Sequence, residues 1–270
     1  MIKALKRKGR NWGKRLLGKF VPGILFPPHD FESIAAAANA VSCDLQSYMD
    51  IDPRSPWYSP EFSAQFGGFH PPGANRELHS MYPGDRTRTD MFLLLLREIT
   101  VRQVPGAMAE LGVHRGTSAK LLHHYCPERR LYLFDTFSGF AEVDFAQESL
   151  KIGFNQNQQF TDTDVVTVLE NIAPKNANAL AVAGWFPASV TPEISAERFA
   201  LIHLDADLEA PISAGLDFFW PRLNPGGFVI VHDYNSWPGA RLAVDRFLSK
   251  SHAVAVPMPD KSGSIVLGKA

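Results

Sequence analysis

Residues 199–234 read FALIHLDADLEAPISAGLDFFWPRLNPGGFVIVHDY, and this stretch decides the fold class. An apolar run at 200–205 ends in an acid and is followed by apolar residues at helical spacing. A Pro-Gly-Gly turn at 225–227 then precedes a second apolar run, 228–231. Strand, helix and strand in this order are typical of a parallel sheet that is buried on both faces. We therefore expect an α/β fold whose ligands bind beyond the carboxyl ends of the strands.

Polar side chains end both of these apolar runs: Asp205 and Asp207 follow the first, and His232 and Asp233 follow the second. Carboxylates at the ends of buried strands are costly unless they meet a cation, a donor or water. A single acid there would be explained by helix capping, which also remains an alternative for Asp207. Four polar groups at two neighbouring strand ends favour a binding site instead.

A second indication of a site is the glycine turn that follows the short apolar strand at 107–112. Gly112 and Gly116 permit a tight turn, and Thr117 and Ser118 can cap the helix that starts there. The free amides of such a helix end suit an anionic ligand. The spacing Gly-x-x-x-Gly differs from the GxGxxG dinucleotide fingerprint, and a glycine pair alone is a weak signal.

The strand at 131–134 ends at Asp135, about 20 residues after the glycine turn. An acid at this position hydrogen-bonds a ribose diol in Rossmann-like folds. The glycine turn and Asp135 therefore support each other as parts of a nucleotide-type site.

The remaining pattern alternates helices and strands and closes with a hairpin. A Pro-Asp-x-x-Gly turn separates the last two strands, which predicts that the final strand is antiparallel. We expect helices at 86–100, 162–171 and 240–248, and strands at 179–183, 253–256 and 264–267.

Charge is unevenly distributed along the chain. Of 27 basic residues, eight precede the first acid, Asp30, so that the other 19 face 28 acidic residues. An acidic body disfavours nucleic-acid binding. The basic stretch at 1–21 fits either a disordered tail or an amphipathic helix that contacts an anionic membrane surface or a partner subunit.

We predict three regions: a basic tail at 1–29, a helical and aromatic-rich lid or substrate segment at 30–84, and a catalytic domain at 85–270. The chain has only two cysteines, Cys43 and Cys126, without CxxC spacing, which excludes a disulfide framework. Neither an apolar run of membrane-spanning length nor the h-region of a signal peptide is present. These features predict a cytoplasmic protein.

Several motifs in order resemble the macrocin O-methyltransferase family of class I S-adenosylmethionine-dependent methyltransferases. The resemblance covers roughly residues 85–270. The motifs that carry it are Glu110-Leu-Gly112-Val-His-Arg-Gly116-Thr-Ser118, Phe134-Asp135-Thr136-Phe137-Ser138-Gly139-Phe140, Gly184-Trp185-Phe186, Leu204-Asp205-Ala-Asp207-Leu208, and Pro221-Arg-Leu-Asn-Pro-Gly-Gly227 leading to Asp233-Tyr234.

The resemblance implies a Rossmann-like, mostly parallel seven-stranded sheet with helices on both faces, an antiparallel last strand and a homo-oligomeric assembly. It also implies that S-adenosylmethionine binds at the glycine turn and at the ends of the second, third and fourth strands. The cofactor-binding residues implied are Glu110, Gly112, His114, Thr117, Ser118, Asp135, Thr136, Phe137, Gly184, Trp185 and Asp205. For Trp185, stacking on adenine and packing in the core both remain open, whereas His203 is interpreted as a hydrogen-bonded core histidine.

The family also binds Mg²⁺ through carboxylates at the ends of the fourth and fifth strands, which here implies Asp205 and Asp233 as metal ligands. His232 stands where the family has a further Asp, and imidazole suits zinc, iron or nickel better than Mg²⁺. His232 is therefore either a third metal ligand or a general base in a metal-free site. Asp205 and His232 are the predicted catalytic residues.

These features predict an O-methyltransferase that acts on a sugar hydroxyl of a saccharide or glycosylated metabolite. Two alternatives stay open. Asp205-Ala206-Asp207 also resembles the DxD signature of metal-dependent glycosyltransferases, although three residues are a weak pattern. A non-catalytic cofactor-binding protein is the other alternative, but it leaves the cluster of acids unexplained.

Overall fold

A computed structural model of the chain describes residues 85–152, 160–172 and 178–270, which all belong to one compact unit, residues 75–270. The predictions made for 1–29 and 30–84 lie outside the described residues. Within the described ranges, no helix is both long enough and apolar enough to cross a membrane.

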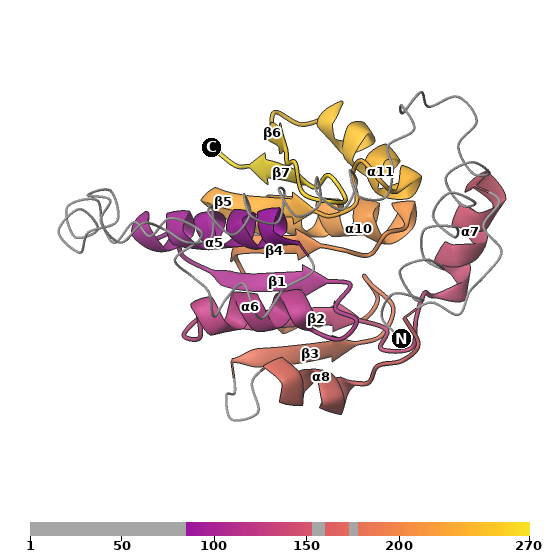
Figure 1. The fold of residues 1–270 in the computed structure, drawn as a ribbon, viewed down its shortest axis with the longest axis horizontal. Coiled ribbons are helices and arrows are strands. Elements are labelled where there is room, and N and C mark those ends of the chain that lie inside the picture. Colours follow the sequence, from indigo (N-terminus) through magenta and orange to yellow (C-terminus); the bar gives the residue numbers. More distant parts are fainter. Residues whose placement is uncertain (1–84, 153–159, 173–177) are drawn as a thin grey trace, which may run out of the picture. The chain divides into compact units, whose positions relative to one another are not determined.

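A seven-stranded sheet forms the centre of the described unit, with the strand order β3-β2-β1-β4-β5-β7-β6 (Figure 1). The first five strands along the chain pair in parallel, and β7 is antiparallel to both β5 and β6. The strands are β1 (Ala107–Leu111), β2 (Leu131–Asp135), β3 (Ala179–Ala183), β4 (Phe199–Leu204), β5 (Leu223–Val231), β6 (Val254–Pro257) and β7 (Ile265–Gly268). The predicted fold class and the antiparallel last strand are confirmed.

Helices cover both faces of the sheet. Those that pack on one face are α5 (Arg86–Val101), α6 (Thr117–Tyr125) and α8 (Val165–Ile172). Those that pack on the other are α9 (Pro192–Ser195), α10 (Glu209–Phe219) and α11 (Pro238–Leu248). A 3₁₀ turn, η3 (Trp220–Arg222), follows α10, and α7 (Glu142–Ile152) contacts α10.

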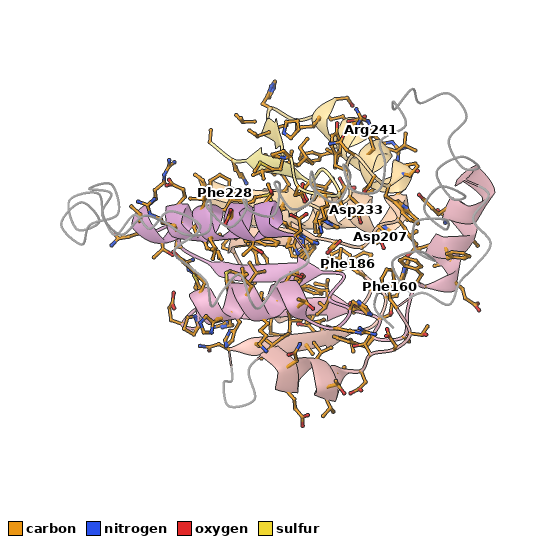
Figure 2. The ribbon with its side chains drawn as sticks, viewed as in Figure 1. Phe160, Phe186, Asp207, Phe228, Asp233 and Arg241 are labelled. Carbon is orange, nitrogen blue, oxygen red and sulfur yellow. The ribbon has the colours of Figure 1, made fainter. Side chains whose placement is uncertain are left out.

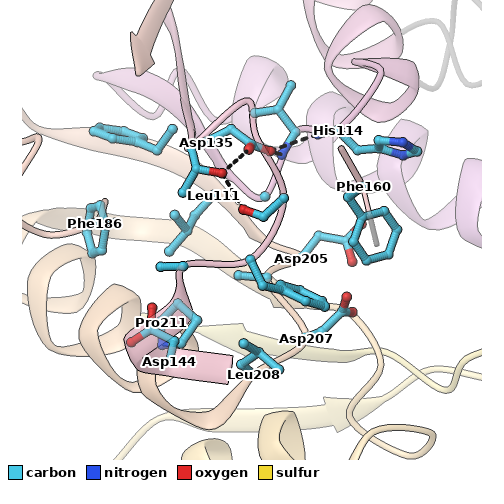
Figure 3. A pocket seen from close by; sticks show the side chains of 18 of the residues that line it. Leu111, His114, Asp135, Asp144, Phe160, Phe186, Asp205, Asp207, Leu208 and Pro211 are labelled. Atoms are coloured by element: carbon cyan, nitrogen blue, oxygen red, sulfur yellow. Dashed lines mark hydrogen bonds between the residues drawn. The ribbon is translucent and has the colours of Figure 1, made fainter. Parts of the chain in front are cut away.

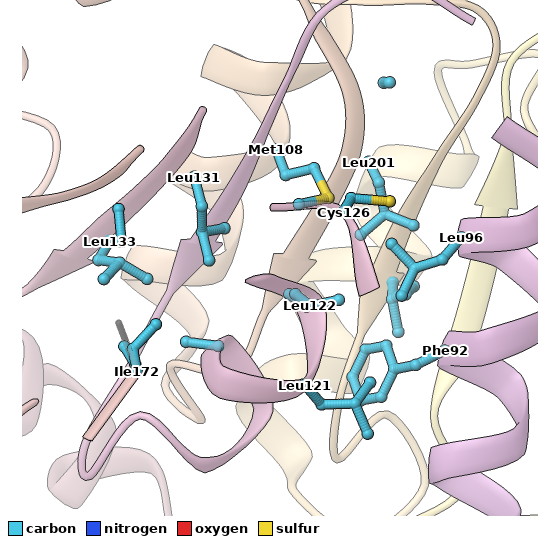
Figure 4. Packing of buried hydrophobic residues seen from close by; sticks show 14 of the residues in the cluster. Phe92, Leu96, Met108, Leu121, Leu122, Cys126, Leu131, Leu133, Ile172 and Leu201 are labelled. Atoms are coloured by element: carbon cyan, nitrogen blue, oxygen red, sulfur yellow. The ribbon is translucent and has the colours of Figure 1, made fainter. Parts of the chain in front are cut away.

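The core on the α5 side shows why these helices form where they do. Phe92 and Leu96 lie one turn apart on α5, and both are fully buried against Leu121 and Leu122 of α6 and the strands beneath (Figure 4). Burying a large apolar side chain stabilises the fold by about 1.5–3 kcal/mol. Packing of these apolar faces therefore holds α5 and α6 on the sheet.

Two features of the fold differ from the sequence-based expectation. Helices α7 and α9 were not predicted, and the predicted turn at Pro225-Gly226-Gly227 is wrong, because these residues lie inside β5. Phe199 of β4 pairs with Leu223, and Leu201 pairs with Phe228, so that β5 advances five residues while β4 advances two. The amide of Gly226 is satisfied by the carbonyl oxygen of Lys269 at 2.7 Å, so an irregular strand replaces the turn.

The first strand ends in a close backbone crossing. Gly112 has φ +87°, and a Cβ at this position would lie 2.1 Å from the carbonyl oxygen of Asp205. Gly112 donates its amide to Phe134, and Asp205 donates its amide to Leu111. The loops after β1 and β4 are thereby locked together at the carboxyl edge of the sheet.

We predict that Gly112→Ala lowers the free energy of unfolding by ~3 kcal/mol or more, because it adds both a backbone clash and an unfavourable φ. Urea denaturation followed by circular dichroism measures this loss. Gly268→Ala is the matched control, since its Cβ would find the nearest atom at 3.8 Å. Equal stability of the two variants would contradict the crossing.

Candidate active site

A pocket of about 420 Å³ opens at the carboxyl ends of the strands, where the sequence predicted a site (Figure 3). Among the predicted residues, those that line it are Gly112, His114, Thr117, Ser118, Asp135, Thr136, Gly184, Trp185, Asp205, His232 and Asp233. Glu110 and Phe137 do not line it. The fold therefore brings together residues that lie up to 121 positions apart, from Gly112 to Asp233.

The Asp135 carboxylate organises one side of the pocket by accepting backbone amides from two loops. Its Oδ2 accepts from Val113 at 2.7 Å and from His114 at 2.9 Å, and its Oδ1 accepts from Phe137 at 2.8 Å. His114 has φ +50°, a conformation that such hydrogen bonds help to hold. Asp135 thus shapes the glycine turn that it was predicted to accompany.

The predicted helix capping by Thr117 and Ser118 is wrong. The N-cap of α6 is Gly116, which has φ +74° and makes no side-chain cap hydrogen bond. Ser118 instead points into the core, where its hydroxyl donates to Glu110 Oε1. The first-turn amides of α6 therefore have no side-chain cap, and Thr117 and Ser118 at this helix end line the pocket.

The other side of the pocket holds a compact group formed by Asp205, His232 and Asp233. His232 Nδ1 lies 2.7 Å from Asp205 Oδ1 and 3.0 Å from Asp233 Oδ2. One ligand atom from each residue falls within 4.8 Å of the others. Asp207 joins the group through a hydrogen bond to Asp233, and Figure 2 shows the two acids side by side.

The sequence left two interpretations of Asp207 open: it either caps the next helix or belongs to the site. The N-cap of α10 is Leu208, with no side-chain cap hydrogen bond, so the capping alternative is wrong. Asp207 and Asp233 both have φ +58°, which turns each chain sharply after its strand. These turns direct both carboxyl groups to the same place.

Burial and mutual charge set the protonation of this group. Burial alone would raise the pKa of Asp205, but Arg88 and His232 hold it well below its usual range. Burial opposes charging of His232 as well, yet Asp205 and then Asp233 raise its pKa to about 10. Near neutral pH the ring of His232 is therefore an imidazolium between two carboxylates.

The pKa values of Asp207 and Asp233, which share a hydrogen bond, shift in opposite directions. Burial, followed by the charge of Asp205, raises the pKa of Asp207 well above its usual value. The pKa of Asp233 is lowered, because its contacts with His232 and Asp207 outweigh burial. Asp207 is thus the neutral acid that donates to the Asp233 carboxylate.

A second polar cluster lies beneath the pocket floor. Glu110 in β1 is fully buried, and its Oε1 lies 2.8 Å from His203 Nδ1. The interpretation of His203 as a hydrogen-bonded core histidine is confirmed. Arg88 of α5, which the sequence analysis did not single out, reaches Asp205 Oδ2 at 2.6 Å. No sequence motif marks it, because its partners are far away along the chain.

Trp185 lines the pocket just after β3, and we call its ring the aromatic wall of the pocket. Trp185 is 45% exposed, so the alternative that it fills the core is wrong. Its indole donates to Asp144 Oδ2 at 2.8 Å, and burial raises the pKa of Asp144. Asp144 was missed because the inward face of α7 carries Asp144, Phe145 and Glu148, and a face this polar gives no hydrophobic period.

Residues 73–263 match the family model described as macrocin-O-methyltransferase (TylF). This range contains all the described motifs of the pocket. The chain belongs to the macrocin O-methyltransferase family. The glycine turn, Asp135 and the cluster of Asp205, His232 and Asp233 all lie within the part of the chain that matches the family.

Two curated relatives indicate the chemistry found in this macrocin O-methyltransferase family. A 4'-O-methyltransferase of 8-demethyl-8-(2,3-dimethoxy-alpha-L-rhamnosyl)-tetracenomycin-C from Streptomyces olivaceus is 29% identical over 157 residues, 54% of this chain and 60% of the relative. Mycinamicin III 3''-O-methyltransferase from Micromonospora griseorubida is 28% identical over 156 residues, 53% of this chain and 61% of the relative. The matches thus span about 60% of each relative's length.

A solved structure agrees with the fold. The O-methyltransferase NovP superimposes with a TM-score of 0.60 at 21% identity, over 68% of this chain and 80% of NovP. The superposition supports the α/β fold with its seven-stranded central sheet.

We predict that Asp135→Asn destabilises the fold by about 1–3 kcal/mol, because its carboxamide offers one oxygen to three backbone donors. Chemical denaturation measures the loss. Asp217→Asn, an exposed position on α10, is the control and should stay within about 0.5 kcal/mol of the parent chain. A neutral Asp135→Asn would show that these hydrogen bonds add no stability.

Proposed function

We propose that this chain is an S-adenosylmethionine-dependent O-methyltransferase that methylates a sugar hydroxyl of a saccharide or glycosylated metabolite. One observation carries the proposal: a single pocket joins the glycine turn and Asp135 to the cluster of Asp205, His232 and Asp233. A methyl donor and an acceptor hydroxyl must meet in line, and a pocket with two chemically distinct ends suits that requirement. The sugar specificity rests on the two named relatives, both of which bear a sugar-position number or a rhamnosyl group in their names.

The cofactor half is assigned to the glycine turn, Asp135 and the aromatic wall. The uncapped amides at the start of α6 suit a carboxylate, as in the amino acid part of S-adenosylmethionine. Oδ2 of Asp135 accepts two backbone amides and Oδ1 accepts one, so Oδ1 retains a lone pair for a ribose hydroxyl. Trp185, oriented by Asp144, offers an exposed aromatic surface for adenine.

Glu110 and Phe137 are the two predicted cofactor residues that do not line the pocket. We propose that they act on the cofactor indirectly. Glu110 holds Ser118, which does line the pocket, and Phe137 donates its amide to Asp135.

The cluster of Asp205, His232 and Asp233 fits a divalent ion. Three donor atoms lie within 4.8 Å, and the buried Nδ1 of His232 contacts both carboxylates without an aligned hydrogen bond to a described residue. Mg²⁺ prefers oxygen ligands, whereas the imidazole extends the choice to zinc, iron or nickel. We propose that these three residues would hold the ion, with Mg²⁺ as the first candidate from the family.

In the reaction, the acceptor oxygen attacks the sulfonium methyl group, the carbon–sulfur bond breaks, and the electron pair stays on sulfur. A bound divalent ion would supply Lewis acidity that lowers the pKa of the acceptor hydroxyl. Asp205 and Asp233 would orient the hydroxyl, and His232 is the proposed base for its proton. Both roles of His232, base and ligand, require a neutral ring, so its proton must leave before the acceptor reacts.

The glycosyltransferase alternative based on Asp205-Ala206-Asp207 is not favoured. The family match spans the glycine turn and Asp135, which a nucleotide-sugar site built on DxD does not require. Contact of residues 1–21 with a membrane surface is a prediction from the sequence. Assembly of the chain into a homo-oligomer is a second such prediction.

We predict micromolar binding of S-adenosylmethionine and its demethylated product, S-adenosylhomocysteine, by calorimetric titration. Asp135→Ala should weaken the binding of both compounds by at least tenfold. The glycine turn loses the carboxylate that organises it, and the ribose loses a hydrogen-bond acceptor. Asp217→Asn should bind like the parent chain. Absence of binding in the parent chain, together with binding of a nucleotide sugar, would overturn the methyltransferase proposal.

Methyl transfer from labelled S-adenosylmethionine is then followed on a panel of rhamnosides and other glycosides. We predict that EDTA followed by gel filtration lowers turnover at least tenfold, and that Mg²⁺ or Mn²⁺ restores it. His232→Asp should shift the preference toward Mg²⁺, because all donor atoms become oxygens. Full turnover after EDTA treatment would refute the metal site and favour His232 as base.

A further inference from the structure

Arg88 occupies a position that is unfavourable for a cation. It is the third residue of α5, in the first turn, where the helix dipole favours negative charge. The side chain is also buried, with 4% of the residue exposed. A buried cation is retained only where anionic or hydrogen-bonding partners compensate for lost water. Its partners therefore indicate what it does.

One terminal nitrogen of Arg88 bridges two elements of the site. Its Nη2 donates to Asp205 Oδ2 at 2.6 Å and lies 3.0 Å from His203 Nε2. A guanidinium only donates, so Nε2 of His203 must accept. The ring proton of His203 then sits on Nδ1, which faces Glu110 Oε1 at 2.8 Å.

The same Glu110 oxygen accepts the hydroxyl of Ser118, which lines the pocket at the start of α6. A continuous hydrogen-bonded chain thus runs from Asp205 to Ser118 beneath the pocket floor. The ring of Phe92 closes it from the α5 side, 5.7 Å from Arg88 Cζ and 5.0 Å from the His203 ring. Buried, walled hydrogen bonds of this kind hold their members in one arrangement.

We propose that Arg88 is a positioning residue that fixes Asp205 for methyl transfer. Arg88 binds Oδ2 of Asp205, which leaves Oδ1 turned toward His232 Nδ1 at 2.7 Å. Arg88 does not line the pocket, so it acts through Asp205 and not on the substrate. Helix α5, which precedes the first strand, thereby contributes a positioning residue to the site. This inference rests on the proposed function.

The test compares Arg88→Met and Arg88→Lys with the matched control Arg102→Met, an exposed cation at the other end of α5 that pairs with Glu98. Turnover is expressed per S-adenosylhomocysteine-binding site, which removes any unfolded fraction. Crystal structures of the parent chain and Arg88→Met report the Asp205 rotamer independently of activity.

We expect Arg88→Met to lower kcat at least tenfold while the Kd of S-adenosylhomocysteine changes less than threefold, with Asp205 turned away from His232. Arg88→Lys should recover part of kcat, because a single nitrogen makes both contacts in the parent chain. The inference would be overturned if Asp205 kept its rotamer in Arg88→Met or if this variant kept its kcat per site. An equal loss of kcat in Arg88→Met and Arg88→Lys would also overturn it. A parent chain without turnover would count against the proposed function, while the Asp205 rotamer would still decide the role of Arg88.

Discussion

The partly buried carboxylate of Asp205 is the constraint on which the site depends. A carboxylate that is largely shielded from water at a strand end needs compensating charge, and here it lies between the Arg88 guanidinium and the His232 imidazolium. This arrangement keeps Asp205 ionised and ties helix α5, strand β4 and the end of β5 to one point. The backbone of the same residue presses on Gly112, so the two halves of the pocket meet at Asp205.

Two carboxylates divide the work of the pocket according to their surroundings. Asp135 accepts backbone amides, and its charge serves to shape a loop. Asp205 faces cations, and in the proposed reaction its charge acts at the acceptor end of the pocket. The separation has a physical basis, because backbone amides are fixed dipoles that set geometry, whereas side-chain cations can be exchanged for a ligand. In the proposed function, one pocket therefore holds a cofactor at Asp135 and an acceptor at Asp205 without either charge neutralising the other.

Helix α7 contributes polar side chains that contact Trp185 and the start of α10. Asp144 reaches the pocket from outside the sheet and orients Trp185, while Glu148 accepts the amide of Glu209 at the start of α10. Arg246 of α11 pairs with the Glu209 side chain. Gly239 of α11 allows this packing, since a Cβ there would lie 2.1 Å from a Glu148 oxygen. The aromatic wall thus depends on polar packing among three helices.

The order of the strands, the glycine turn, Asp135 and the acids at the strand ends were all determined by the sequence, because apolar periodicity and turn chemistry are local along the chain. Only the tertiary structure decided the irregular course of β5 through Pro225–Gly227, the role of Asp144, and the place of Arg88. It also decided the charge of His232, which follows from two carboxylates at fixed distances. Polar burial depends on partners that are remote in sequence, and no local pattern carries that information.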